Sequence, residues 1–347
     1  INLIKEKKIK QNQIIEPKNF ENLINKINEK KIIIDIKSCS YYYENIFSKR
    51  FKILKNNDPI YLLKSIKNSS EIHNMIQSHI LDGAALTKFL YWIKNVNKRK
   101  ISEFDAQNKL EKFRKKNQNY LYPSFNTIAG AGANGAIVHY RALKENAKII
   151  KNTDIFLCDS GGQYKYGTTD VTRTICFSKP QKNIRSIFTK VLKGHIAVAT
   201  TNLDIKKTGQ LIDKRARMFL KKINLDYEHG TGHGVGFFSN VHEGPQSISK
   251  YNKVKILEGM ILSNEPGYYK KGKFGIRIEN LVYVKKLNKK LFFENLTLAP
   301  IDIDLIDFKQ LTLDEKNYLF KYHIMVYSKL SPFLNKNEKK WLASLII

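Results

Sequence analysis

Cysteine is scarce in this chain of 347 residues, and long apolar runs are missing. The three cysteines are odd in number, and no two of them have the CxxC spacing of a redox or zinc motif. This usage excludes a disulfide framework and indicates a reducing compartment, so we expect a cytoplasmic protein. No apolar stretch approaches the roughly 20 residues of a membrane-crossing helix, and we expect no membrane partner.

The start of the chain also lacks two familiar features. It begins with Ile1 instead of methionine, and its first ten residues contain no apolar core of the kind found in signal peptides. We therefore expect a piece of a longer polypeptide, without a signal peptide.

Arginine is rare for so basic a protein. The net charge is +30, yet only nine of the 61 basic residues are arginine, and the lysines are spread from Lys5 to Lys340. Surfaces that bind nucleic acid concentrate basic residues on one face and favour arginine for phosphate. We interpret the charge as a solvated surface and expect no nucleic-acid partner. With 42% hydrophobic and 11% aromatic residues, the composition is that of a globular protein.

Apolar periodicity predicts several helices with strands between them. The predicted helices cover about 18–30, run from Ser69 and from Ser102, cover about 181–200 and 208–222, and run from about Thr312. Ser69 or Ser70 and Ser102 are the predicted caps, and a buried strand is predicted at Lys31–Ile36.

The stretch Asp159-Ser-Gly-Gly-Gln-Tyr-Lys-Tyr-Gly-Thr-Thr-Asp170 carries the first chemical indication. Apolar residues precede Asp159 and follow Asp170, and a glycine pair and a turn lie between them. This pattern predicts a β-hairpin with one carboxylate on each strand, both directed into a common space. Two buried carboxylates that lie close together repel unless they share a proton or a cation.

Histidine is concentrated further along the chain. His229, His233 and His242 lie within fourteen residues, although the whole chain has only eight histidines. The glycines around His233 allow the backbone to pass close to a site, and they argue against a helical metal-binding pair. His139 follows another glycine-rich segment, which lacks the ending of a P-loop. Taken alone, His139 would be interpreted as an ordinary structural histidine.

Two further carboxylates interrupt apolar strands. Glu265 precedes a proline that cannot continue a ladder, and Arg277 and Glu279 share one face of a strand. A charged residue inside an apolar strand needs a partner. The set with ligand chemistry is Asp159, Asp170, His233, Glu265 and Glu279. Its four negative charges would balance two divalent cations, and its oxygen-rich chemistry favours Mn²⁺, with Zn²⁺ or Co²⁺ as alternatives.

These stretches resemble the motifs of Xaa-Pro aminopeptidases (aminopeptidase P), most closely the cytosolic type. The resembling motifs are Asp-Ser-Gly followed by Gly-Thr-Thr-Asp-Val-Thr-Arg-Thr, then Gly-Thr-Gly-His-Gly-Val-Gly, Val-His-Glu-Gly-Pro, Ser-Asn-Glu-Pro-Gly-Tyr-Tyr and Gly-Ile-Arg-Ile-Glu-Asn-Leu. The resemblance implies an α/β (α+β) pita-bread fold, with two pseudo-symmetric halves around a dimetal site. It also implies a peptide substrate with proline in the second position, whose first residue is removed by a hydroxide bridging two divalent metal ions.

The resemblance assigns the metal ligands residue by residue. Asp159 would bind one metal ion, and Asp170 and Glu279 would bridge both. His233 and Glu265 would complete the other ion, and Glu265 would also handle the proton of the attacking hydroxide.

The resemblance assigns the remaining roles to the substrate side. His139, His229 and His242 would bind the substrate and stabilise the tetrahedral intermediate. Arg277 would orient ligands, and a plain structural ion pair explains it equally well.

The resemblance also divides the chain. Residues 1–57 would be the remnant of an upstream, creatinase-like N-terminal domain, 58–300 the catalytic domain and 301–347 a C-terminal helical extension. The apolar residues of the extension suggest docking on a second subunit, and we expect a homodimer. Tyr166 stands where cytosolic members usually have aspartate, and Gly162 where they usually have alanine, so we expect a local change in that turn.

Five alternatives remain. Methionine aminopeptidase shares the fold and its ligand logic, but the Val-His-Glu-Gly-Pro and Asn-Glu-Pro-Gly-Tyr-Tyr stretches argue against it. A prolidase-like Xaa-Pro dipeptidase and creatinase are closer relatives. A non-catalytic binding protein on the same fold is the fourth, although such proteins lose ligands that are all present here. The fifth is a truncated, decaying gene product whose site is still readable.

Overall fold

The structure is a computed structural model that describes residues 2–96, 100–205 and 207–346. It contains two compact units, Ile1–Leu63 and Lys64–Ile347. Ile1 and Ile347, which begin and end the predicted first and last segments, lie outside the described residues. The predicted division at 57/58 and 300/301 stays a prediction.

The first unit is a small βαβ arrangement. Strands β1 (Lys31–Ile34) and β2 (Lys52–Lys55) pair in parallel, and α3 (Tyr41–Ser48) lies between them in sequence. The buried core of this unit is limited to Ile24, Ile46 and Phe51. The other elements are α1 (Asn2–Lys5), η1 (Gln11–Gln13), η2 (Pro17–Asn19), α2 (Phe20–Asn25) and α4 (Pro59–Ser65), which crosses into the second unit.

The structure corrects two predicted boundaries in this unit. The helix predicted over about 18–30 is shorter, because α2 ends at Asn25, where an asparagine-rich sequence favours the helix weakly. The strand predicted as Lys31–Ile36 ends at Ile34.

The second unit is built from two halves, and the first carries two helices and two antiparallel sheets. The helices are α5 (Ser69–Asn95) and α6 (Glu103–Arg114). One sheet has the order β4 (Ile128–Ala131), β5 (Ile155–Ser160), β8 (Val171–Cys176), and the other β3 (Tyr120–Pro123), β6 (Gly162–Tyr164), β7 (Gly167–Thr168). Between β4 and β5 lies η4 (Gly132–Ala136). Ser102 caps α6 as predicted, whereas Asn68 caps α5 in place of a serine, because its side chain accepts the Glu71 N–H.

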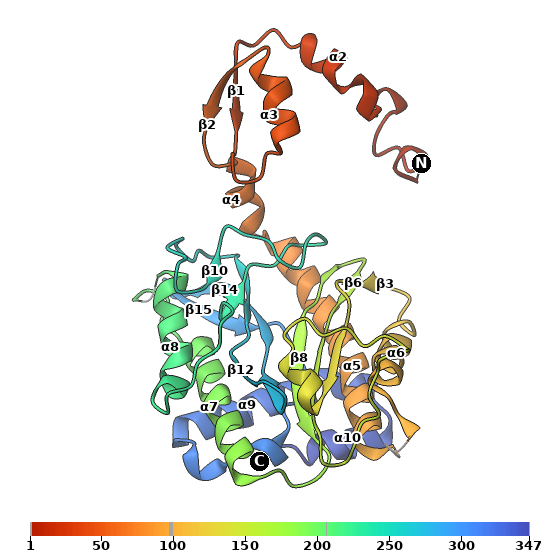
Figure 1. The fold of residues 1–347 in the computed structure, drawn as a ribbon, viewed down its shortest axis with the longest axis vertical. Helices are drawn as coiled ribbons and strands as arrows, with labels where there is room; N and C mark the ends of the chain where they lie inside the picture. Colours follow the sequence, from red (N-terminus) through yellow and green to blue (C-terminus); the bar gives the residue numbers. More distant parts are fainter. Residues whose placement is uncertain (1, 97–99, 206, 347) are drawn as a thin grey trace. The chain divides into compact units, whose positions relative to one another are not determined.

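The second half repeats this arrangement. Helices α7 (Lys182–Ala199) and α8 (Gly209–Lys221) accompany a three-stranded antiparallel sheet of β11 (Ile261–Asn264), β14 (Asn280–Leu287) and β15 (Lys290–Asn295). Two short ribbons complete it, β9 (Gly232–His233) with β10 (Ser247–Ile248), and β12 (Gly267–Lys270) with β13 (Phe274–Arg277). Figure 1 shows α5 and α6 beside one set of strands and α7 and α8 beside the other. Two similar halves in one α/β unit agree with the predicted fold.

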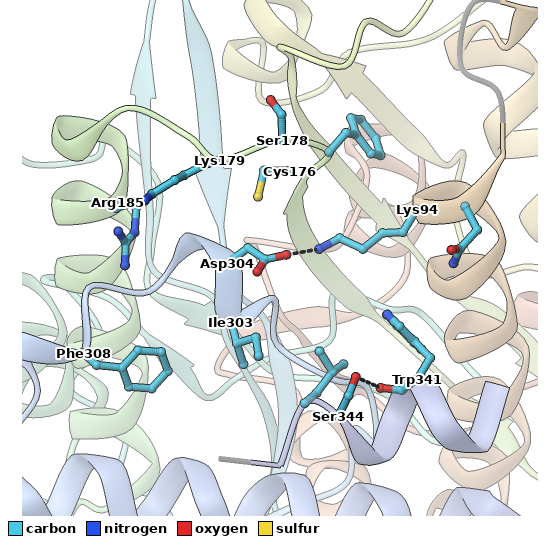
Figure 2. Close-up of a pocket in the computed structure, with 13 residues that line it drawn as sticks. Lys94, Cys176, Ser178, Lys179, Arg185, Ile303, Asp304, Phe308, Trp341 and Ser344 are labelled. Carbon is cyan, nitrogen blue, oxygen red and sulfur yellow. Dashed lines mark hydrogen bonds and ion pairs between the residues drawn. The ribbon is translucent and has the colours of Figure 1, made fainter. Parts of the chain in front are cut away.

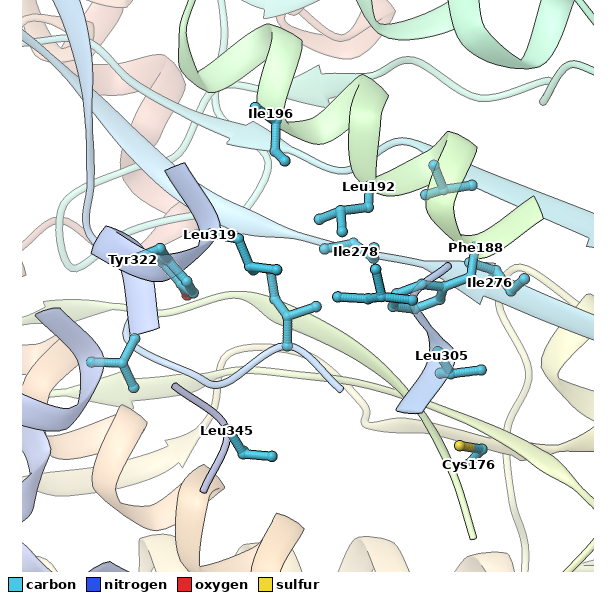
Figure 3. Packing of buried hydrophobic residues seen from close by; sticks show 14 of the residues in the cluster. Cys176, Phe188, Leu192, Ile196, Ile276, Ile278, Leu305, Leu319, Tyr322 and Leu345 are labelled. Atoms are coloured by element: carbon cyan, nitrogen blue, oxygen red, sulfur yellow. The ribbon is translucent and has the colours of Figure 1, made fainter. Parts of the chain in front are cut away.

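The C-terminal segment packs into the main core. It contains η5 (Ile303–Leu305), η6 (Phe308–Gln310), α9 (Leu313–Leu330), η7 (Ser331–Phe333) and α10 (Lys336–Ala343), and Thr312 caps α9. Figure 3 shows Leu319 and Tyr322 of α9 near Leu192 of α7 and Ile278, which follows β13. The same core also contains Ala84 of α5 and Cys176 of β8, so it holds the segment against both halves. None of the helices in the described ranges is long and apolar enough to cross a membrane.

The predicted hairpin is present with a different turn. Strands β5 and β8 pair with Asp159 opposite Thr172, and Asp170 directly precedes β8 instead of lying within it. The residues between them form β6 and β7, which join a separate sheet with β3. At Gly162 a Cβ atom would lie 2.7 Å from a ring carbon of Tyr164, so the tyrosine packing there excludes an alanine.

Candidate metal centre

All nine predicted site residues line one cavity of about 440 Å³ in the second unit. The first half contributes the loop that follows η4, the end of β5 and the residue before β8. The second half contributes β9, the segment before β10, and the ends of β11 and β13. The residues are His139, Asp159, Asp170, His229, His233, His242, Glu265, Arg277 and Glu279.

Four carboxylates and one imidazole form two overlapping groups. Oxygen atoms of Asp159, Asp170 and Glu279 lie within 4.8 Å of one another, and so do ligand atoms of His233, Glu265 and Glu279. Glu279 belongs to both groups, and the Glu279 N–H donates to the Thr172 carbonyl, 3.2 Å away, across the two halves. The spacing fits two cations that share ligands.

The orientation of His233 suits a ligand. Its Nδ1 lies 2.9 Å from the Gly234 carbonyl oxygen, which can only accept a hydrogen bond, so the proton is assigned to Nδ1. The other ring nitrogen, Nε2, then carries a lone pair. It faces Asp170 Oδ2 at 3.4 Å and Glu265 Oε1 at 3.5 Å.

The protein itself offers too little positive charge and too few hydrogen-bond donors to balance the buried carboxylates of the cavity. Burial, together with repulsion from Asp159, raises the pKa of Asp170 well above its usual value. Burial and repulsion from Asp170 act in the same direction on the pKa of Glu279. Among the described residues, the buried Asp159 Oδ1 has no hydrogen-bond partner. Divalent cations would satisfy these charges and this oxygen, so the donor set fits the predicted metals.

Arg277 bonds residues of both halves of the second unit. Its guanidinium donates to Asp159 Oδ2 at 2.6 Å, to Thr172 Oγ1 at 3.0 Å and to the Tyr269 hydroxyl at 2.6 Å. The Thr172 hydroxyl donates in turn to Glu279 Oε2 at 2.7 Å. Burial outweighs the guanidinium at Asp159, whose pKa is still raised. These contacts support a role for Arg277 in orienting Asp159 and Glu279. The ion pair between Arg277 and Asp159, which the sequence offered as the alternative explanation, is also present.

The three other histidines differ in their surroundings. His229 Nε2 lies 2.9 Å from the Tyr269 hydroxyl, and burial lowers its pKa. The His242 ring stacks on His233 with 3.7 Å between centroids, and burial, with the neighbouring His233, lowers its pKa to about 4. His139 is exposed and lies in a turn after η4.

Sequence reasoning missed Tyr269 and Thr172. Both stand inside quoted motifs, Asn-Glu-Pro-Gly-Tyr-Tyr and Asp-Val-Thr-Arg-Thr, and that position is the only indication the sequence offers. Tyr166, in contrast, is 40% exposed in the turn between β6 and β7 and does not line the cavity.

A larger cavity of about 780 Å³ lies elsewhere in the unit (Figure 2). Near it, atoms of Cys176, Asp302 and Asp304 lie within 4.8 Å of one another. The Lys94 ammonium lies 2.7 Å from Asp302 and 2.9 Å from Asp304, where a metal ion would have to sit. Because a lysine already neutralises this cluster, it does not compete with the first cavity as a metal site.

Two family models match the chain. The model of metallopeptidase family M24 matches residues 73–286, and the model of the C-terminal region of peptidase M24 matches 289–345. The first match contains all nine predicted site residues.

Two curated relatives are similar to the chain in sequence. An uncharacterized peptidase of Schizosaccharomyces pombe is 46% identical, over 84% of this chain and 51% of its own. A "Probable Xaa-Pro aminopeptidase P" of Pyrenophora teres f. teres is 43% identical, over 84% and 47%. The chain thus spans about half the length of these relatives.

Two solved structures bear on the fold. X-prolyl aminopeptidase from Caenorhabditis elegans, described as a cytosolic enzyme with a di-nuclear active site, has a TM-score of 0.86 and 32% identity, over 94% of this chain and 56% of its own. A prolidase from Pyrococcus furiosus has a TM-score of 0.68 and 26% identity, over 82% and 80%.

Proposed function

The chain belongs to metallopeptidase family M24, with its pita-bread fold, and from this premise we propose that it removes an N-terminal residue that precedes proline. The observation that carries the proposal is the convergence of all nine predicted site residues on one cavity. The names of relatives at 43% identity and of the C. elegans neighbour support the Xaa-Pro specificity.

Two divalent cations would be held by the two overlapping groups. Asp159, Asp170 and Glu279 would bind one cation, and His233, Glu265 and Glu279 would bind the other. Asp170 Oδ2 also lies 3.4 Å from His233 Nε2, so Asp170 would contribute to the second site as well. We propose Mn²⁺, since four carboxylates and one imidazole suit a hard-to-borderline ion. When bound, the two ions supply an activated water and polarise the scissile carbonyl.

The protein's own residues would divide the remaining work. Glu265, held by a hydrogen bond from Ser263 Oγ to its Oε1 at 3.0 Å, would accept a proton from the attacking water and deliver it to the leaving nitrogen of proline. His242, kept neutral by its surroundings, would hydrogen-bond the substrate as the carbonyl becomes tetrahedral, together with the exposed His139. His229 is also kept neutral, but its Nδ1 lies 2.7 Å from the Gly230 carbonyl oxygen and its Nε2 lies 2.9 Å from the Tyr269 hydroxyl, so it would bind the substrate by giving up one of these bonds.

Arg277 would keep Asp159 and Glu279 in place. It contacts Asp159 directly and Glu279 through Thr172, so its effect on the reaction is one of orientation. Tyr269 bonds both Arg277 and His229 and would link the ligand side of the cavity to the substrate side.

We also propose a cytosolic homodimer. The C. elegans neighbour, described as cytosolic, supports the location. Leu313, Phe320 and Ile324 occupy one face of α9 and are 73%, 42% and 42% exposed, which supports self-association through the C-terminal segment. Light scattering on the wild type and on Phe320→Lys tests this, because a dimer should become a monomer in the variant.

A comparison of three peptides tests the proposed specificity. Metal-stripped protein is reloaded with Mn²⁺ and offered an Xaa-Pro-Yaa tripeptide, an Xaa-Ala-Yaa tripeptide and an Xaa-Pro dipeptide. The proposal expects release of the first residue from Xaa-Pro-Yaa alone or in clear preference. Faster cleavage of the dipeptide would favour the prolidase alternative, for which the P. furiosus prolidase is a structural neighbour. Bound metal without cleavage of any peptide would indicate a non-catalytic protein.

A further inference from the structure

Glu243 is a buried carboxylate that none of these roles uses. It directly follows His242 and is only 3% exposed. Its Oε2 lies 3.0 Å from Lys64 Nζ and its Oε1 lies 3.7 Å from Lys67 Nζ. The Lys67 side chain is fully buried. Burying such a pair costs desolvation that the attraction barely offsets, so stability alone explains it poorly.

The ammonium side of the pair is anchored on the second half. The Lys67 N–H donates to the Gly259 carbonyl at 2.9 Å, and the Gly259 N–H donates to the carbonyl of Val284 on β14 at 2.9 Å. Lys67 Nζ also donates to the Ser65 carbonyl at 3.3 Å. The positive charge that faces Glu243 is therefore held at a defined place.

The backbone of Glu243 connects two cavity residues. Its N–H donates to the Gly234 carbonyl at 2.8 Å, and Gly234 directly follows His233. His242 directly precedes Glu243, and its ring stacks on the His233 ring at 3.7 Å with 26° between the planes. One residue thus holds together the chain segments that carry both imidazoles.

Two glycines make room for this arrangement. A Cβ atom at Gly236 would lie 2.7 Å from Glu243 Oε2, and one at Gly234 would lie 2.1 Å from the Glu243 carbonyl oxygen. Both distances are shorter than van der Waals contact. The sequence indicated only that these glycines let the backbone pass close to a site. The structure shows that Gly234 and Gly236 leave room for Glu243.

Close neighbours of the His242 ring are His233, on which it stacks, and Asp170, whose ligand atom lies within 4.8 Å of a ring nitrogen. His242 is exposed, and so are Phe238, Ser239 and Asn240, which precede it in the same loop. Glu243 is the adjacent buried anchor. We propose that Glu243 is a positioning residue, whose ion pair with Lys67 and Lys64 sets the place of the His242 ring against His233 for the peptidase reaction. The kinetic consequence rests on the proposed function, and the geometric one does not.

The first test follows the ring itself by NMR of histidine-labelled, metal-stripped protein, with His242→Ala used to assign the signal. Glu243→Gln, which keeps the size of the side chain and removes its charge, should broaden or double the His242 signal. Lys64→Met, whose lysine is 39% exposed, is a milder variant that should produce a smaller change. The control is Glu315→Gln, which breaks the 2.5 Å pair with Lys193 away from the cavity and should leave the signal unchanged.

The second test measures kcat, KM, bound Mn²⁺ and thermal midpoint in the same variants. Glu243→Gln should lower kcat roughly 10- to 100-fold while bound metal stays at the wild-type level, because a misplaced group costs rate without costing ligands. Lys67→Met should act similarly, and adding it to Glu243→Gln should cost little more. Glu315→Gln should lower the midpoint and leave kcat unchanged.

The positioning role of Glu243 and the proposed peptidase function fail through different results. A wild-type His242 signal and wild-type kcat in Glu243→Gln would overturn the positioning role. If the wild type cleaves no peptide, the proposed function fails, and the NMR signal alone decides the position of His242. Should Glu243→Gln not fold, an unchanged ring signal and unchanged kcat in Lys64→Met would overturn the role.

Discussion

The four crowded carboxylates predict an unusual response of stability to metal. In metal-stripped protein, Glu279→Gln removes one of the negative charges that Asp159, Asp170 and Glu265 face. Because like charges in a buried cluster repel, the variant should be as stable as the wild type or more stable. In the presence of Mn²⁺ the order should reverse, because Glu279 belongs to both ligand groups.

The size of the reversal follows from linkage. A cation at 100 times its dissociation constant stabilises the folded state by about 2.7 kcal/mol for each site. For a unit the size of Lys64–Ile347, each kcal/mol added to the free energy of unfolding raises the thermal midpoint by about 2 °C. Each bound ion should therefore raise the midpoint by roughly 5 °C. Glu279→Gln should lose this gain at both sites, and Asp159→Asn should lose it chiefly at one.

Differential scanning calorimetry with and without Mn²⁺ provides the assay. The matched control is Glu294→Gln, which removes a 40%-exposed carboxylate of β15 paired with Lys285 and should keep the full metal response. An equal metal response in Glu279→Gln and the wild type would refute the shared-ligand reasoning. So would a metal-stripped Glu279→Gln protein that is several kcal/mol less stable than the wild type.

Three further predictions concern other parts of the second unit. His323 accepts the Ile301 N–H at Nε2 and donates to the Leu345 carbonyl, and burial lowers its pKa to about 4. Since this lies below the unfolded value of about 6.5, its stabilisation is present above pH 6.5 and is lost as pH falls toward 4, by about 2 kcal/mol at pH 5. Denaturant unfolding should show a weaker pH dependence for His323→Gln, and equal slopes would contradict the assignment. Arg114 pairs with Asp82 at 2.7 Å in a fully buried site, so Arg114→Met should cost about 3–5 kcal/mol. Adding Asp82→Asn should recover part of that loss in urea unfolding, and no recovery would mean that packing dominates. His242→Ala should lower turnover with metal content near the wild-type level, and loss of metal would make His242 a ligand.

Local patterns in the sequence pointed to most of the predicted site residues, whereas His139 was assigned only through the family resemblance. Glu265 and Glu279 are single charges among apolar residues, and Asp159 and Asp170 flank a turn, so the local pattern made them visible. The prediction that Glu265 and Glu279 interrupt strands was wrong in detail, because Glu265 directly follows β11 and Glu279 lies between the end of β13 and the start of β14. The same local reasoning located the long helices, whose apolar spacing is unambiguous.

Contacts between distant segments were beyond such reasoning. Arg277 meets Asp159 across 118 residues of sequence, and Thr172 meets Glu279 across 107. No local period records those pairings, so Tyr269 and Thr172 went unassigned. The separate sheet of β6 and β7 was missed for a similar reason, because its partner β3 lies some forty residues upstream.

The boundary errors have local causes. Asn68 competes with Ser69 for the cap of α5, and both residue types cap well, so propensity does not choose between them. The side-chain contact of Asn68 with Glu71 decides the matter.

The most direct test of a two-metal peptidase centre is a titration of metal-stripped protein with Mn²⁺. Bound metal and release of the first residue from an Xaa-Pro-Yaa peptide are measured on the same samples. The account predicts that both saturate together at about two ions per chain, as two shared ligand groups require. Peptide cleavage that persists undiminished in metal-stripped protein, or a folded chain that binds no Mn²⁺, would contradict it.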